Sequence, residues 1–190
     1  MIKWPVWVSA CLSALSLCGC ATTTSQSTKA ASYTGDPQRM YLLITSNFSQ
    51  QLGYPFASQT EQDVLASARK CGVVIDGQVA SALDLNPQGA LESALTYKPD
   101  VIMAMSFTGG ATDPYGQWVR ANIDVRLWQP GKKYLAWHDI SQVNAAPAAT
   151  VQTRAESFTT NLFQRLSADG VLTHCDPSVL HPPKDQRTGS

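Results

Sequence analysis

A stretch of strict alternation in the middle of the chain constrains its fold more than any other feature. From residue 118 to residue 127, apolar side chains occupy every second position and mostly polar ones lie between them. The apolar set is Val119, Ala121, Ile123, Val125 and Leu127, and the other set is Trp118, Arg120, Asn122, Asp124 and Arg126. Because successive side chains of a strand point to opposite faces of a sheet, this pattern predicts a long strand with one buried and one solvent-facing side.

The flanking segments extend this strand into a sheet. Residues 128–133 (Trp-Gln-Pro-Gly-Lys-Lys) place proline and glycine where a turn needs them, so residues 134–143 are expected to return as an antiparallel partner. Short apolar runs predict further strands, at residues 40–45, 73–75, 101–107 and 171–173.

Three amphipathic segments predict helices between these strands. In the first, residues 59–70, we expect Thr60 to cap the helix and Gly72 to end it. A second helix is expected to start at Asn86-Pro87, and residues 151–168 predict a third. The resulting order is β-α-β-α-β-β-β-α-β. It predicts an α/β (α+β) fold with a mixed sheet of five to six strands and about three helices.

The first twenty residues have the features of an export signal. Lys3 is followed by 12 uncharged, mostly apolar residues, a run shorter than the roughly 18 needed to span a membrane. This run covers residues 6–17, and its last residue begins Leu17-Cys18-Gly19-Cys20, which resembles the lipobox of bacterial lipoproteins. That resemblance implies cleavage before Cys20 and its acylation, with palmitate among the usual acyl groups. An ordinary secretory signal is the alternative. Ala21 occupies the position where an inner-membrane retention signal has Asp, so the resemblance implies the periplasmic face of the outer membrane.

Composition divides the 190-residue chain into four segments. Residues 1–19 are the expected signal peptide. The small polar residues of 20–38 predict a flexible tether with an end-to-end distance of roughly 25 Å, because they offer little apolar surface to bury. Residues 39–175 form the expected periplasmic domain, and the polar, proline-containing residues 176–190 predict a disordered tail.

Charge and cysteine content exclude several classes of function. The chain has 14 Lys+Arg and 14 Asp+Glu, and its charged fraction of 15% lies below the typical value of about 25%, so no strong field attracts nucleic acid. No CxxC spacing predicts a metal site. Cys71 and Cys175 would remain in an oxidising compartment after processing and acylation. We expect a disulfide between them, and two independent thiols are the alternative.

The sequence contains no pattern typical of an active site. A cysteine nucleophile needs a histidine within reach, and His138, His174 and His181 occur in no catalytic motif. The Gly109-Gly110 pair is not followed by the lysine of a phosphate loop. We therefore predict a protein without catalytic residues or cofactor; a hydrolase using His138 is the alternative.

Aromatic and arginine side chains predict a binding surface instead. They lie on the predicted solvent-facing side of the long strand or in its loops, namely Tyr115, Trp118, Arg120, Arg126 and Trp128. These residue types dominate protein interfaces, so we expect them to contact a protein partner. The alternative is that the third helix covers this face.

Two longer segments resemble envelope lipoproteins with a TolB amino-terminal-like domain. They are residues 98–105 (Lys-Pro-Asp-Val-Ile-Met-Ala-Met) and 128–137 (Trp-Gln-Pro-Gly-Lys-Lys-Tyr-Leu-Ala-Trp). Members include lipoprotein activators of penicillin-binding proteins and the curli secretion lipoprotein. The resemblance implies a non-catalytic, partner-binding accessory subunit of an envelope assembly or secretion machine. A binding domain for a small envelope ligand, such as a glycan fragment held between Tyr115 and Trp118, is the alternative.

Overall fold

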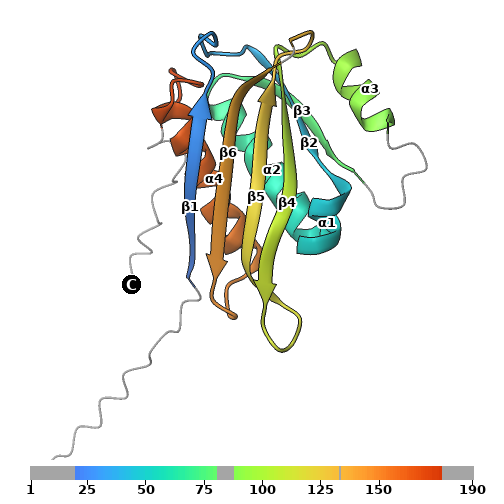
Figure 1. The fold of residues 1–190 in the computed structure, drawn as a ribbon, viewed down its shortest axis with the longest axis vertical. Coiled ribbons are helices and arrows are strands. Elements are labelled where there is room, and N and C mark those ends of the chain that lie inside the picture. The colour runs from blue at the N-terminus through green and yellow to red at the C-terminus, as the bar shows by residue number, and fades with distance from the viewer. Residues whose placement is uncertain (1–19, 81–87, 133, 177–190) are drawn as a thin grey trace, which may run out of the picture.

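The computed structural model describes residues 20–80, 88–132 and 134–176. They form a mixed α+β fold, as the sequence predicts (Figure 1). The strands are β1 (Ala21–Lys29), β2 (Arg39–Ile44), β3 (Val74–Val79), β4 (Val101–Thr112), β5 (Trp118–Trp128) and β6 (Leu135–Ala145). The helices are α1 (Ser46–Leu52), α2 (Tyr54–Lys70), α3 (Gly89–Thr96) and α4 (Val151–Ala168).

The strands form a single open sheet in the order β1-β6-β5-β4-β2-β3. Its β2 strand runs parallel to β3 and β4, whereas β4, β5, β6 and β1 are antiparallel neighbours. The expected hairpin is therefore confirmed as β5 and β6. The sheet is mixed because helices connect β2, β3 and β4, which run parallel, whereas turns connect β4, β5 and β6, which run antiparallel.

Helices cover the two faces of the sheet unequally. The main core lies between one face and helices α1, α2 and α4, and it includes the fully buried Trp137, Phe56 and Phe158. On the opposite face, α3 packs Ala94 against Tyr41 of β2, near the β2–β3 edge of the sheet. Within the described part of the chain, no helix covers the other side of β5, β6 and β1 (Figure 1). This side is called the open face below.

The first helical region begins earlier than predicted. Residues 46–52 already form α1, and α2 begins at Tyr54 rather than at residue 59. Thr60 is therefore not a cap but a fully buried residue inside α2. The reason is Pro55, which lies in the first turn of α2, where proline is tolerated because its missing N–H has no helical partner.

The predicted tether over residues 20–38 is wrong. Residues 21–29 form β1, which pairs with β6 along its whole length, so the folded domain begins before residue 39. Composition misses this strand because it buries no apolar side chain. Its contacts with α4 are polar: Thr23 hydrogen-bonds Ser157 over 3.0 Å, and the Arg165 Nε donates to Ser25 Oγ over 2.9 Å.

The segment at residues 171–173 forms turns instead of the predicted short strand. Val171 and Leu172 are buried in the core, while Thr173 donates its backbone N–H to Asp36 over 2.7 Å. Here the hydrogen bond from Thr173 to the Asp36 side chain takes the place of strand-to-strand backbone hydrogen bonds. The expected signal peptide and most of the expected tail, residues 177–190, lie outside the described residues.

A buried carboxyl group lies beneath β1. Asp139 is fully buried and accepts a 2.6 Å hydrogen bond from Ser141, whereas its Oδ1 atom has no hydrogen-bond partner. Burial raises the pKa of Asp139 above its ordinary value, and the Ser141 hydrogen bond and the positive charge of Arg165 oppose this shift only in part. The folded protein therefore binds this proton more tightly than the unfolded chain does.

We expect Asp139→Asn to stabilise the protein at neutral pH. Because the folded-state pKa is raised, the favourable contribution of Asp139 is complete below its unfolded pKa and is lost as the pH rises through the folded value. The amide carries no charge at any pH, so its unfolding free energy should exceed that of the parent at pH 7 by on the order of 1 kcal/mol. Urea unfolding at pH 4 and pH 7 measures the difference, which should shrink at pH 4. A less stable variant at pH 7 would contradict this expectation.

Candidate functional site

The open face contains a buried charged cluster. The β5–β6 register places Asp124 opposite Ile140 and Arg126 opposite His138. Asp124 is only 5% exposed. The Arg126 guanidinium binds both of its carboxylate oxygens, with Nε donating to Oδ1 over 2.8 Å and Nη2 to Oδ2 over 2.9 Å. His138 Nε2 lies 3.3 Å from Asp124 Oδ1. Arg126 from the same strand and His138 from β6 therefore flank the carboxylate.

This cluster fixes the orientation of Arg126. Its hydrogen bond with Asp124, together with the negative charge of that carboxylate, raises the pKa of Arg126 above its ordinary value. A fork of two hydrogen bonds also restricts the side chain, which stays about half exposed at 48%. Arg126 therefore presents a preordered, permanently cationic group at the surface.

Exposed apolar side chains surround Arg126. Trp128, Tyr134 and Ile140 are 40%, 45% and 50% exposed. A hollow of about 370 Å³ lies among Arg126, Trp128, Lys132, Tyr134 and Leu135. We call these five residues together with Ile140 the β5–β6 patch. Most of it lies at the turn between β5 and β6, at the upper end of the sheet in Figure 1. It combines two aromatic rings with two cationic side chains.

The predicted binding residues divide between the two ends of the sheet. Arg126 and Trp128 lie together in the β5–β6 patch. Arg120 is exposed near the start of β5, and Tyr115, 89% exposed, lies in the β4–β5 turn at the opposite end. The patch members Tyr134 and Ile140 were not predicted from sequence, although both belong to the strand expected to pair with β5.

Trp118 does not lie on the open face. The β4–β5 register shifts between Ala111, which pairs with Arg120, and Thr112, which pairs with Trp118, so Val119 is an extra residue. Such a bulge reverses the alternation of side chains beyond it. Trp118 therefore packs on the helix side, with its ring 5.1 Å from that of Phe56. The hollow beside Trp118 is lined by residues that include Phe107 and Arg120, and Tyr115 is not among them, so it does not match the expected pocket between Tyr115 and Trp118.

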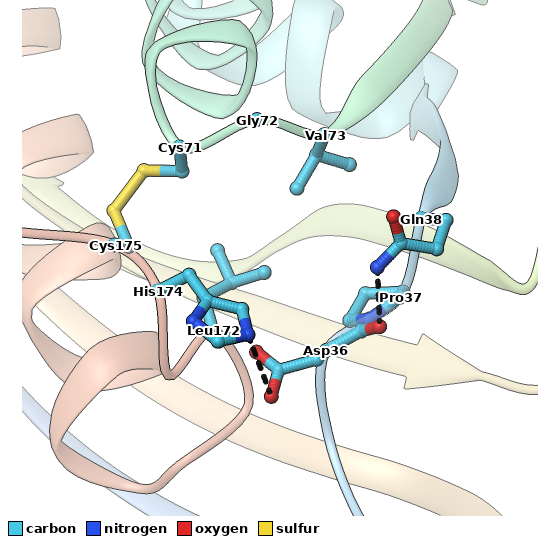
Figure 2. Close-up of a pocket in the computed structure, with 9 residues that line it drawn as sticks. All are labelled: Asp36, Pro37, Gln38, Cys71, Gly72, Val73, Leu172, His174 and Cys175. Carbon is cyan, nitrogen blue, oxygen red and sulfur yellow. Dashed lines mark hydrogen bonds and ion pairs between the residues drawn. A yellow bond between two sulfur atoms is a disulfide. The ribbon is translucent and has the colours of Figure 1, made fainter.

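A disulfide joins Cys71 and Cys175, as predicted. It borders a small cavity of about 160 Å³ at the end of α2 (Figure 2). On the other side of this cavity, Asp36 accepts a 2.6 Å hydrogen bond from the Thr173 hydroxyl, which lowers the pKa of Asp36 below its ordinary value. His174 Nε2 lies 4.0 Å from the Asp36 carboxylate. The disulfide and Asp36 both hold the segment that follows α4, so we interpret the contacts around this cavity as structural.

The histidines of the described residues lie apart from one another. His138 approaches Asp124 on the open face, whereas its neighbour Asp139 points to the helix side, so these two residues do not form a pair. His174 lies beside Asp36, and His181 lies outside the described residues.

Within the described ranges, no group of three or more His, Cys, Asp or Glu side chains could hold a metal ion. None of the helices described there is long and apolar enough to cross a membrane.

Comparisons with known proteins give no family assignment. No protein-family model and no curated protein matches the chain. Among solved structures, a PelC dodecamer from Paraburkholderia phytofirmans aligns with a TM-score of 0.48 and 14% identity over 80% of this chain and 98% of that chain. A Xanthomonas campestris protein of the DUF330 family aligns with a TM-score of 0.38 and 12% identity over 83% and 95%. Likeness at this level carries no argument about function. The resemblance to TolB amino-terminal-like lipoproteins stays a prediction.

Proposed function

We propose that this protein is a lipid-anchored accessory subunit of an envelope machine that binds a protein partner through the β5–β6 patch. The anchor would be Cys20, which follows the lipobox-like Leu17-Cys18-Gly19 and is exposed at the start of β1. The Ala21 that follows it favours the outer membrane, with the domain in the periplasm. Acyl chains stabilise membrane attachment by about 0.8 kcal/mol per buried CH₂, so a triacylated cysteine holds a domain stably.

The observation that carries the binding role is the arrangement around Arg126. Exposed Trp128, Tyr134 and Ile140 would bury apolar area against a partner, and Arg126 is already oriented by Asp124. Trp, Tyr and Arg supply most binding energy in protein interfaces when they are desolvated together. A partner surface with apolar side chains and a carboxylate would complement this patch.

We expect Trp128→Ala to abolish partner capture. Loss of a central tryptophan typically costs 2 kcal/mol or more, equivalent to about 30-fold weaker binding. Cells that express the parent or the variant are treated with a cross-linker, the protein is immunoprecipitated, and bound proteins are identified by mass spectrometry. The matched control is Tyr54→Ala, which removes a 62% exposed aromatic side chain from the start of α2.

The proposal predicts a discrete envelope protein with the parent and with Tyr54→Ala, but not with Trp128→Ala. Equal capture by all three proteins would contradict the β5–β6 patch as the binding surface. If no partner is captured with the parent, the accessory-subunit proposal is wrong. The search would then turn to small anionic ligands in the hollow beside Trp128.

A further inference from the structure

The position of Cys20 in the fold determines which end of the domain an acyl anchor would hold. The Cys20 carbonyl accepts a 3.1 Å hydrogen bond from the backbone N–H of Ala146, and the next residue, Ala21, pairs with Ala145 of β6. The backbone of Cys20 is thus held directly beside the first residue of the sheet. Acyl groups on this residue would be attached directly to the domain, without the tether that composition predicts.

Two connecting loops lie at the same end of the sheet as Cys20. They are the β4–β5 turn at residues 113–117 and the β6–α4 connection at residues 146–150, both at the lower end in Figure 1. Tyr115 in the turn is 89% exposed, and Val151, directly after the connection, is 41% exposed. Residues 114–117 and 146–150 contain no charged side chain. This end therefore offers exposed aromatic and aliphatic groups with little charge to desolvate.

The β4–β5 turn has a defined shape. Oδ1 of Asp113 accepts hydrogen bonds from the backbone N–H groups of Tyr115 and Gln117, each over 2.9 Å. The one carboxylate near the tip is thereby engaged with the backbone. This arrangement holds the turn closed and leaves the Tyr115 ring pointing away from the core, as its exposure shows.

We propose that the lipidated domain stands end-on on the bilayer, with Tyr115 in the headgroup region and the β5–β6 patch directed away from the membrane. The inference rests on the proposed anchoring at Cys20. Tyrosine is enriched at membrane interfaces because its ring is apolar and its hydroxyl is polar. The 11 residues of β5 separate the Tyr115 turn from the β5–β6 turn by roughly 35 Å. The patch would therefore be presented to a partner about one domain length from the lipid.

The proposal is tested with a fluorophore at each end of the domain. The lipidated protein is purified from membranes as Tyr115→Cys or, as the matched control, Lys132→Cys. In this form Cys20 is a thioether and Cys71 and Cys175 are joined, so the introduced thiol alone reacts with an NBD label. The labelled proteins are placed in vesicles of phosphatidylethanolamine and phosphatidylglycerol (3:1) with or without lipids that have a quencher near the headgroup.

We expect a blue-shifted emission and at least threefold stronger quenching at position 115 than at position 132. Equal, weak quenching at both positions would overturn the proposal, because the domain would then be held off the membrane. Stronger quenching at 132 would overturn it as well and indicate the opposite orientation. The intact mass of the purified protein, measured first, distinguishes the two proposals. An unmodified Cys20 would refute the proposed anchoring. Acylated protein without quenching at position 115 would refute only the orientation.

Discussion

Replacing Cys71 and Cys175 together by Ser is expected to lower the free energy of unfolding by about 2–5 kcal/mol. The disulfide closes a loop of 104 residues, for which the chain-entropy model gives about 4.7 kcal/mol as an upper figure. Because it joins the end of α2 to the segment after α4, its loss removes one of the two contacts that hold this segment, the other being Asp36. Urea unfolding, followed by circular dichroism, measures the change.

Reductant provides the control for this prediction. Dithiothreitol should lower the unfolding midpoint of the parent toward that of the double variant and leave the variant itself unchanged. A parent that is as sensitive to urea as the variant under oxidising conditions would contradict a stabilising disulfide. The double replacement is preferred to a single one because it leaves no unpaired thiol at this site to form intermolecular bridges.

Sequence patterns predict the elements of this fold where burial and local geometry act together. The alternation along β5 and the Pro130-Gly131 turn define the central hairpin, and the amphipathic α4 has the predicted bounds, residues 151–168. Pairing of Cys71 with Cys175 is predicted because these are the cysteines that the expected export, processing and acylation would leave, and the disulfide is present. In each case the residues that determine the structure are adjacent in sequence or few in number.

Features that depend on distant partners could not be predicted in this way. The polar β1 strand exists because β6 provides its backbone partners and α4 provides polar side-chain partners more than 100 residues later. Trp118 changes sides because of the bulge at Val119, which alternation alone does not reveal. The sequence predicts the β5–β6 patch only in part, since Tyr134 matters because it lines the hollow with Arg126 and Trp128, and Ile140 because it lies opposite Asp124.

Trp137 of β6 lies in the main core and also reaches the polar contacts that hold β1 against α4 and the residue after it. It is fully buried, and its indole N–H donates a 2.7 Å hydrogen bond to Asp169 Oδ2, just after α4. The same oxygen accepts a 2.6 Å hydrogen bond from Ser27 Oγ of β1. Trp137 therefore contributes packing to the core and helps to orient the carboxylate that holds β1.

We expect Trp137→Ala to lower the free energy of unfolding by about 3–5 kcal/mol, because it removes a large buried side chain and leaves a cavity. Trp137→Phe is the matched control: it keeps most of the packing but not the N–H, and it should cost about 1–2 kcal/mol. Urea unfolding followed by circular dichroism measures both changes. In both variants hydrogen exchange should accelerate in residues 21–29 relative to α2, since Asp169 loses its fixed orientation.

Unchanged exchange in β1 would show that Asp169 does not depend on Trp137 to hold this strand. If β1 does loosen, the variants also test the proposed orientation of the domain on the membrane. Cys20 is held beside the sheet only while β1 stays paired with β6. If Cys20 is acylated as proposed, a released β1 would place about ten residues of flexible chain between the acyl groups and the domain, with a reach of up to roughly 35 Å. Quenching at position 115 should then fall in Trp137→Phe, although the domain itself stays folded.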